Sequence, residues 1–310
     1  MPKNILLVAK PWRGGLSNYI NRALKAFPNS NVSFVSTYPE SPLEYLNYKI
    51  NKKDWHDKIV NQINDSKYDV ALFINSQSSF TNLAHSNKNI LWLTDGAKIT
   101  KNELNRFSGV YLSDLGYLKD LPHRDNFVSG LPFAYDPIVH SPMPSIRKKR
   151  FCCSIINKDL NRDEWLKKSN IEGVMPDVYG NYFLRHRLFW RNPSKFHKTL
   201  KIYQMGKVYG QYEVSLNIHS SVIMEGTNMR SFECAGYGIA QLIEMKPGLE
   251  ALLEPEKEFL GFSDIESYVT QFNRLKNDSK LRIKLVENAK KRVAAEHTYQ
   301  HRINTIFKNL

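Results

Sequence analysis

The chain has 310 residues, of which 42% are hydrophobic and 24% are charged, and its formal net charge is +14. This composition is ordinary for a globular protein and excludes a disordered, collagen-like or coiled-coil chain. No apolar run approaches the roughly 18 residues of a transmembrane helix, and the N-terminal apolar run is too short for a signal peptide. The length favours two domains.

The first 130 residues alternate strand and helix patterns. Continuous apolar runs such as Asn4–Ala9 predict strands buried in a parallel sheet. Apolar residues three or four positions apart, as in Leu16–Phe27, predict amphipathic helices. The alternation favours a doubly wound α/β unit. The predicted strands are 4–9, 31–36, 68–75, 89–94 and 109–112, and the predicted helices are 16–27 and 53–63.

Residues 131–150 contain four prolines and no periodicity, which is typical of a connection between domains. A second α/β unit follows, with predicted strands at 151–156, 177–179, 215–219 and 241–243 and predicted helices at 265–275, 279–294 and 299–307. We therefore predict two Rossmann-like doubly wound parallel-sheet domains that face each other across a ligand-binding cleft. The predicted domains are residues 1–140 and 141–295, and residues 296–310 form a C-terminal helix placed against the first domain.

Three cysteines, Cys152, Cys153 and Cys234, are too few for a disulfide framework. Cys152 and Cys153 are neighbours in a predicted strand, so we expect their side chains on opposite faces of the sheet. Buried free thiols are the expected state, which favours a reducing, cytoplasmic setting.

The positive charge is concentrated in residues 147–207, which carry 15 Lys and Arg against 5 Asp and Glu, whereas residues 208–310 carry 13 of each. This asymmetry predicts an anionic partner, either a nucleotide diphosphate, an acidic glycan, a lipid headgroup or nucleic acid. A solvated surface is the alternative interpretation. Aromatic residues are interleaved with the basic ones, among them Tyr179, Tyr182, Phe183, Phe189 and Trp190.

Two glycines, Gly14 and Gly15, separate the first predicted strand from the first helix. Such a pair lets the backbone approach a ligand, and the helix N-terminus offers free N–H groups to an anion. The turn matches neither a GxGxxG nor a Walker loop, which argues against NAD and ATP. A plain strand-to-helix turn is the alternative.

The segment 220–238 carries the most specific pattern. It follows the predicted strand 215–219 and contains Glu225 and Glu233 with seven residues between them. If Thr227 or Asn228 caps a helix, Glu233 lies in its second turn. A carboxylate there can accept two hydrogen bonds from the vicinal hydroxyls of a ribose.

The neighbours of these glutamates extend the predicted site. Gly226 and the free amides near Asn228 would hold a diphosphate, and Arg230 would add a charge-assisted contact. Glu225, on the loop, would reach a sugar attached to that diphosphate.

This segment resembles the C-terminal half of retaining GT-B glycosyltransferases, whose Glu-x7-Glu motif is followed by a glycine that Gly238 matches here. The more specific likeness is to the CgeB-type glycosyltransferase-like spore-protein family. It rests on Asn-x-Arg-x-Phe-Glu at 228–233, Lys-Pro-Gly-Leu-Glu at 246–250, Glu-His-Thr-Tyr-x-x-Arg at 296–302 and Leu-Pro-x-Ala-x-Asp-Pro at 131–137.

The resemblance implies a GT-B fold in which the first domain binds an acceptor and the second binds a nucleotide-diphosphate sugar, with a UDP-sugar as the expected donor. It implies Glu233 as the ribose-binding residue and a retaining outcome. The usual Gly-Arg…Lys-Gly phosphate clamp after the first strand of the second domain is absent. Lys158 and Arg162 stand in its place and are predicted to substitute for it.

Two further candidate residues end predicted strands. Asp95 ends a predicted strand, where a carboxylate can orient an acceptor hydroxyl or act as a base, and a turn cap is the alternative. His219 also ends a strand and is predicted, with Tyr179, to line the donor site. The sequence has no Asp-x-Asp and no HExxH, so we expect no metal cofactor.

The predicted function is a metal-independent glycosyltransferase that moves a sugar from a nucleotide-diphosphate sugar to an anionic acceptor, either a cell-envelope glycan or a lipid-linked acceptor at the membrane surface. One alternative acceptor is the modified bases of phage DNA. A non-catalytic GT-B-like protein that binds an anionic polymer is an alternative of another class, and a sugar-nucleotide epimerase is a third.

Overall fold

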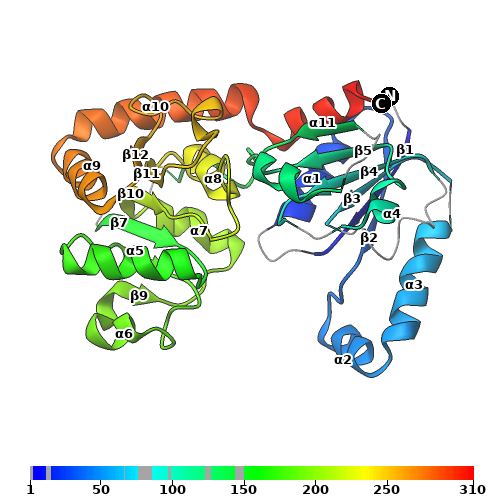
Figure 1. Cartoon of the computed structure of the whole chain (residues 1–310), viewed down its shortest axis with the longest axis horizontal. Coiled ribbons are helices and arrows are strands. Elements are labelled where there is room, and N and C mark those ends of the chain that lie inside the picture. The colour runs from blue at the N-terminus through cyan, green and yellow to red at the C-terminus, as the bar shows by residue number, and fades with distance from the viewer. Residues whose placement is uncertain are drawn as a thin grey trace. The chain divides into compact units, whose positions relative to one another are not determined.

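The computed structural model describes residues 3–11, 15–65, 67–75, 86–96, 99–122, 127–143 and 150–310. The chain divides into two compact units (Figure 1). The first comprises residues 1–132 and 299–310, and the second comprises residues 133–298. The division falls eight residues before the predicted boundary at residue 140, because the connecting segment packs on a helix of the second unit.

The first unit contains a parallel sheet in the described part of the chain, with the strand order β2-β1-β3-β4-β5-β6. The interior strands are apolar and buried, as their sequences predict. The strands are β1 (Asn4–Ala9), β2 (Asn31–Ser36), β3 (Tyr68–Ile74), β4 (Ser86–Leu93), β5 (Gly109–Leu112) and β6 (Phe127–Gly130). The helices are α1 (Leu16–Lys25), α2 (Pro42–Ile50), α3 (Lys52–Asn64), α4 (Lys101–Leu104), the 3-10 helix η1 (Leu115–Asp120) and α11 (Tyr299–Lys308).

Helix α2 and strand β6 are absent from the sequence-based prediction. The apolar residues Leu43, Leu46 and Ile50 of α2 recur three and four positions apart, which is a helical pattern, but none of the residues of the helix is buried. Strand β6 is an edge strand whose sequence, Phe-Val-Ser-Gly, is short and half polar. The prediction therefore omits α2 although its pattern is helical, and omits β6 because the strand has no periodicity.

The last helix, α11, belongs to the first unit and packs on α1. The rings of Phe27 and Phe307 lie 5.0 Å apart, and those of Tyr19 and Tyr299 lie 5.6 Å apart. The buried Arg302 donates from Nε to the carbonyl oxygen of Pro132 at 2.7 Å. Helix α11 thus returns to the first unit beside Pro132, the residue at which the chain leaves that unit.

The second unit contains another parallel sheet, with the order β12-β11-β10-β7-β8-β9 in the described residues. The strands are β7 (Arg150–Ile155), β8 (Asp177–Tyr179), β9 (Phe196–His197), β10 (Tyr212–Asn217), β11 (Ala240–Glu244) and β12 (Leu260–Phe262). The helices are α5 (Leu160–Ile171), α6 (Arg187–Arg191), η2 (Pro193–Lys195), α7 (Ile202–Tyr209), α8 (Met229–Tyr237), η3 (Leu249–Ala251), α9 (Ile265–Asn277) and α10 (Ser279–Glu296).

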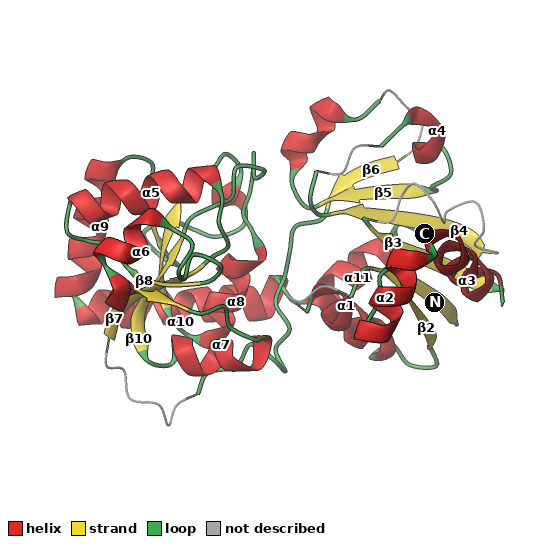
Figure 2. Cartoon of the chain, turned by 90° about the horizontal axis from the view of Figure 1, so that it is seen from below, coloured by secondary structure: helices red, strands yellow, loops and turns green. Residues whose placement is uncertain are grey.

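Helices cover both faces of this second sheet. Helices α5, α6 and α9 pack on one face, and α7 and α8 pack on the other (Figure 2). Cys152 faces the first group and Cys153 the second, and all three cysteines are buried free thiols, so both predictions are confirmed. In a doubly wound sheet of this kind, ligands bind at the carboxyl ends of the strands.

Among the described residues, no helix has the length and apolar character needed to span a bilayer.

Candidate functional site

The candidate site lies at the carboxyl ends of β7, β10 and β11 in the second unit. The segment after β10 leads into α8, whose N-cap is Asn228, as the sequence predicts. The side-chain Oδ1 of Asn228 accepts the backbone N–H of Arg230 at 2.9 Å, and the side-chain amide nitrogen of Asn228 donates to Oδ1 of Asn217 at 2.9 Å. The first turn of α8 is thereby anchored to the end of β10. Its backbone N–H groups and positive dipole end form a potential anion site.

Glu233 lies in the second turn of α8 and is 3% exposed. Arg230 donates from one terminal nitrogen to Oε2 of Glu233 at 2.8 Å, one helical turn away. Oε1 of Glu233 lies 3.5 Å from Nε2 of His140 in the connecting segment. Glu233 is therefore fixed from two sides, and Arg230 is drawn along the helix towards it.

The protonation of His140 follows from its other contact. Its Nδ1 accepts the backbone N–H of Asp136 at 2.9 Å, so a neutral ring carries its proton on Nε2, towards Glu233. Burial lowers the pKa of His140 below its ordinary value, although Glu233 and Asp136 oppose the shift. The ring is therefore neutral at neutral pH, and its Nε2 proton faces the Glu233 carboxylate at a distance of 3.5 Å.

The connecting segment also fits closely against α8. A Cβ added at Gly236 would lie 2.5 Å from the ring of Tyr135 and 2.8 Å from the carbonyl oxygen of His140. Only a glycine allows this approach. The place of His140 beside Glu233 thus depends on the packing of the connection on α8.

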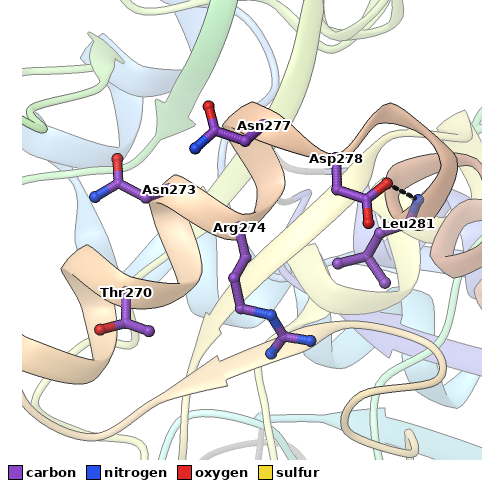
Figure 3. Close-up of a pocket in the computed structure, with 6 residues that line it drawn as sticks. All are labelled: Thr270, Asn273, Arg274, Asn277, Asp278 and Leu281. Atoms are coloured by element: carbon purple, nitrogen blue, oxygen red, sulfur yellow. Dashed lines mark hydrogen bonds between the residues drawn. The ribbon is translucent and has the colours of Figure 1, made fainter.

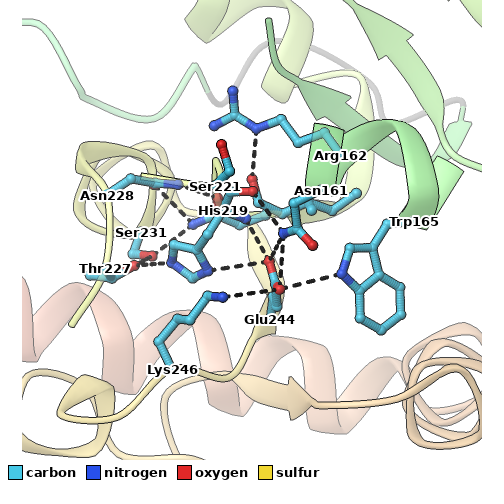
Figure 4. A network of polar contacts seen from close by, with 12 residues as sticks. Asn161, Arg162, Trp165, His219, Ser221, Thr227, Asn228, Ser231, Glu244 and Lys246 are labelled. Atoms are coloured by element: carbon cyan, nitrogen blue, oxygen red, sulfur yellow. Dashed lines mark hydrogen bonds and ion pairs between the residues drawn. The ribbon is translucent and has the colours of Figure 1, made fainter. Parts of the chain in front are cut away.

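A buried carboxylate at the end of β11, Glu244, links several segments of the site (Figure 4). Its oxygens accept the backbone N–H of His219 at 2.8 Å, the amide of Asn161 at 3.0 Å and the indole N–H of Trp165 at 3.3 Å. Nζ of Lys246 lies 3.5 Å away. Burial alone would raise the pKa of Glu244, but the hydrogen bonds from His219 and Asn161 outweigh it and lower the pKa to about 2. Glu244 is therefore ionised at any physiological pH.

His219 is fully buried beneath the segment that leads to α8. Its Nε2 lies 2.9 Å from the hydroxyl of Thr227, and its Nδ1 lies 3.7 Å from Oε2 of Glu244. Burial lowers the pKa of His219, so the ring is neutral. The sequence predicts that His219 lines the donor site, but its buried ring can influence a ligand only through Thr227.

Basic groups gather near the same edge. Arg162, on α5, donates from Nε to the carbonyl oxygen of Ile218 at 3.0 Å, which places its guanidinium over the end of β10 (Figure 4). Burial lowers the pKa of Arg162, yet a guanidinium stays charged. Lys158 is exposed on the segment between β7 and α5, and Lys246 is partly exposed after β11. Of these cations, Lys158 and Arg162 are the two that the sequence predicts in place of a phosphate clamp.

The remaining predicted residues of this unit have different positions. Gly226 adopts a left-handed backbone, with φ of 73°, and donates its N–H to the carbonyl oxygen of Pro247 at 2.6 Å. Glu225 precedes it and is half-buried. Tyr179 is buried, stacks on His197 at 4.4 Å and places its hydroxyl 3.2 Å from that of Tyr212, the first residue of β10. The Tyr179 hydroxyl therefore points to the amino end of the sheet and is not brought to the candidate site.

The predicted residues of the first unit lie at the carboxyl ends of its own strands. Asp95, just after β4, accepts a hydrogen bond from the amide of Asn75 at 3.2 Å. Partial desolvation raises the pKa of Asp95, and the charge of Lys10 opposes the shift only in part. Gly15 is the N-cap of α1 with φ of 82°, and Gly14 lies outside the described residues.

Sequence reasoning missed Glu244, His140 and Asn161. Glu244 ends an apolar strand, at the ligand-binding edge, and this place in the sequence is a usable signal. His140 and Asn161 carry no local signal, because their partners lie 93 and 83 positions away in the chain.

Two other features of the described residues do not form sites. Among the described residues, no group of three or more His, Cys, Asp or Glu side chains could hold a metal ion. A hollow of about 620 Å³ lies on α9 and the start of α10 (Figure 3). Its charged groups already have partners, since Asp278 caps α10 by accepting the N–H of Leu281, and Arg274 pairs with Glu256. The hollow therefore offers little to a ligand.

Comparison with known proteins places this geometry in a class. Residues 162–308 match the sequence profile of a family described as glycosyl transferase-like. The sequence has no match among curated proteins.

Several solved structures are similar over nearly the whole chain. Anabaena HepE in complex with UDP-glucose is 12% identical, with 99% of this chain and 100% of that chain covered and a TM-score of 0.69. A glycosyltransferase from Rickettsia africae is 10% identical, with 99% and 97% covered and a TM-score of 0.68. Sucrose-phosphate synthase from Thermosynechococcus elongatus is 12% identical, with 99% and 98% covered and a TM-score of 0.62. The chain has the GT-B fold, and the family match together with this fold supports a GT-B glycosyltransferase.

Proposed function

We propose that this protein transfers a sugar from a nucleotide-diphosphate sugar to an acceptor, and that the second unit binds the donor at the carboxyl ends of β7, β10 and β11. The observation that carries the proposal is the start of α8, capped by Asn228, with the Arg230–Glu233 pair one turn further on. Anabaena HepE, a protein of similar fold, has been solved with UDP and with UDP-glucose. A UDP-sugar is accordingly the donor we propose, and the resemblance to the CgeB-type family is part of this proposal.

The proposed roles follow the chemistry of each group. Glu233 accepts hydrogen bonds from the ribose hydroxyls, and the first-turn amides of α8 face the diphosphate. Arg230 has five N–H donors, and its single bond to Glu233 leaves donors for a phosphate. Arg162 and Lys158 add positive charge that stabilises the departing diphosphate, with no metal required.

The sugar and the acceptor are assigned to the other carboxylates. Glu225, just before Gly226, is proposed to face the transferred sugar, and the Glu-x7-Glu spacing favours a retaining outcome. Asp95 in the first unit is proposed to orient the acceptor hydroxyl or take its proton, a task that its raised pKa suits.

An anionic acceptor is supported by the composition of the segments on either side of β9. Residues 178–212 contain seven Lys and Arg and no Asp or Glu. Trp190 and Tyr203 in this stretch are each 72% exposed. Cations with exposed aromatic rings suit an acidic glycan or a lipid-linked acceptor at an anionic membrane surface. Binding to DNA that weakens steeply with salt, with none to anionic vesicles, would favour the DNA acceptor instead.

The proposal is tested by the thermal unfolding of the protein with UDP-, GDP-, dTDP- and CMP-linked sugars in the presence of EDTA. A donor at about 100 times its Kd stabilises the native state by about 2.7 kcal/mol, which raises Tm by several degrees. Glu233→Ala should abolish this rise and lower kcat/KM at least about 10-fold, because a charged hydrogen-bond acceptor is lost. Glu287→Ala, an exposed glutamate on α10, is the control and should change neither. No rise with any nucleotide sugar would favour the non-catalytic alternative.

A further inference from the structure

We propose that Glu244 is a positioning residue of the donor site: acting through His219 and Thr227, it fixes the segment that begins α8 in the conformation that binds the nucleotide diphosphate. The inference rests on the proposed donor site and adds to it a residue that would touch neither the donor nor the acceptor.

The charge of Glu244 sets the direction of the hydrogen bonds around His219. Oε2 of Glu244 accepts the backbone N–H of His219 at 2.8 Å and lies 3.7 Å from Nδ1 of its ring, beyond hydrogen-bond distance, so the negative charge favours the neutral tautomer with its proton on Nδ1. Nε2 must then accept from the hydroxyl of Thr227 at 2.9 Å. Thr227 in turn accepts from the hydroxyl of Ser231 at 2.6 Å, and Ser231 accepts from the amide of Asn217 at 2.8 Å. In this tautomer each hydroxyl has one orientation, which the negative charge of Glu244 favours.

The side chains that link Glu244 to Asn217 are buried. His219, Thr227, Ser231 and Asn217 are each at most 1% exposed, and Glu244 is 6% exposed. Buried polar groups in a chain polarise one another, and a missing member leaves its neighbour without a partner. The arrangement therefore tolerates few alternatives and holds Thr227 in one place.

Thr227 fixes the backbone of the segment that begins α8. This residue lies between Gly226, whose N–H donates to the carbonyl oxygen of Pro247, and Asn228, which caps α8. With its side chain anchored inward, the backbone on either side is directed towards the open edge of the sheet. Glu225 and the first-turn amides of α8 depend on this backbone for their positions.

Glu244 also contacts α5 and the segment that follows β11. The same carboxylate accepts from Asn161 and Trp165 of α5 and pairs with Lys246 after β11. The segments that follow β7, β10 and β11 are therefore held by one charge, as a supporting contact holds a binding constellation.

The test compares four variants in the full chain by titration calorimetry with UDP-glucose and by hydrogen exchange of the ligand-free protein. Glu244→Gln keeps the shape but replaces an acceptor oxygen with a donor, and Thr227→Val removes one hydroxyl. Both should raise Kd about 10-fold or more. Thr227→Ser, which keeps the hydroxyl, should stay within about 2-fold of the native Kd. The matched control is Glu258→Gln. Glu258 is a buried glutamate that precedes β12, at the amino ends of the strands, and it accepts the backbone N–H of Glu254 at 2.7 Å.

Glu244→Gln should speed the exchange of amides 225–231 selectively, and Glu258→Gln should not. The double variant Glu244→Gln with Thr227→Val should bind about as weakly as either single variant, because both break one chain. Native-like binding by Glu244→Gln, or equal weakening by Glu258→Gln, would overturn the positioning role while leaving the donor site in place. Failure of the native protein to bind any nucleotide sugar would overturn the proposed function and the donor role of Glu244 together. Unchanged exchange at 225–231 would overturn the hold on Thr227 whatever the donor result.

Discussion

At the amino end of the second sheet, Asp177 accepts from the hydroxyl of Tyr212 at 2.7 Å and from Arg150 at 2.8 Å, whereas at the carboxyl end Glu244 accepts from His219, Asn161 and Trp165. Both carboxylates are buried and well partnered. The partners of Asp177 are side chains at the starts of strands, whose backbone is already held by the ladder. The partners of Glu244 lie beyond the strand ends, in a loop and in the helix α5. The same chemistry therefore holds strands together at their amino ends and, in our proposal, shapes the candidate site at their carboxyl ends.

The largest effect on stability is expected at α8, the helix that leaves the carboxyl edge. Gly236→Ala would place a Cβ 2.8 Å from the carbonyl oxygen of His140, so the connecting segment or the helix must shift. We expect a loss of about 1–3 kcal/mol and a weakened donor response, since His140 would move from Glu233. The measurement is chemical unfolding with the nucleotide-sugar thermal shift.

Gly206→Ala is the matched control for that variant. An added Cβ there would meet only the side chains of Tyr237 and Met143, at 3.0 and 3.2 Å, and these can adjust. An equal loss in the two variants would show that α8 does not depend on its fit against the connection.

Asp177→Asn should separate the two edges of the sheet. Arg150 and Lys195 would lose their charged partner, but both are nearly half exposed and can be hydrated. We therefore expect a loss of about 1–2 kcal/mol in the free energy of unfolding. Donor affinity, measured by calorimetry, should be unchanged. A Kd raised as much as in Glu244→Gln would mean that the two edges do not differ in role.

Acidification should weaken the carboxyl edge through its histidines. Burial lowers the pKa of His140 and of His219 in the folded protein, so the unfolded chain takes up protons at the ordinary pKa of about 6.5 before the folded one does. The contribution of these two histidines to the free energy of unfolding is therefore fully present above pH 6.5. Below that pH the free energy of unfolding falls, by up to about 1.4 kcal/mol per pH unit for each histidine. Unfolding midpoints at pH 7.5, 6.5 and 5.5 measure the slope.

His219→Gln should reduce that slope by the share of one proton while leaving the contribution of His140. A slope that is unchanged in this variant would place the proton uptake elsewhere in the chain. Stability that rises on acidification would contradict the lowered pKa values of both rings.

Much of the candidate site could be predicted because it is local in the chain. Asn228 caps α8, and Glu233, five positions later, falls in its second turn because a helix has 3.6 residues per turn. The roles of His219 and Tyr179 could not be predicted in this way. Tyr179 ends β8, and His219 lies two residues after the end of β10. Burial places the His219 ring under Thr227, and packing on His197 directs Tyr179 towards the amino ends of the strands.

The sequence by itself determined the apolar interior strands of both units, a cap at Thr227 or Asn228 and the spacing of Glu225 and Glu233, because hydrophobic periodicity and capping act over a few residues. It did not indicate the short edge strands β6, β9 and β12. Only the tertiary structure decided that His140 reaches Glu233 from the connecting segment and that Glu244 links His219 to α5. These contacts join residues far apart in the chain, and the packing of α5 and α8 on opposite faces of one sheet brings them together. A buried carboxylate is stable only where such packing supplies its donors.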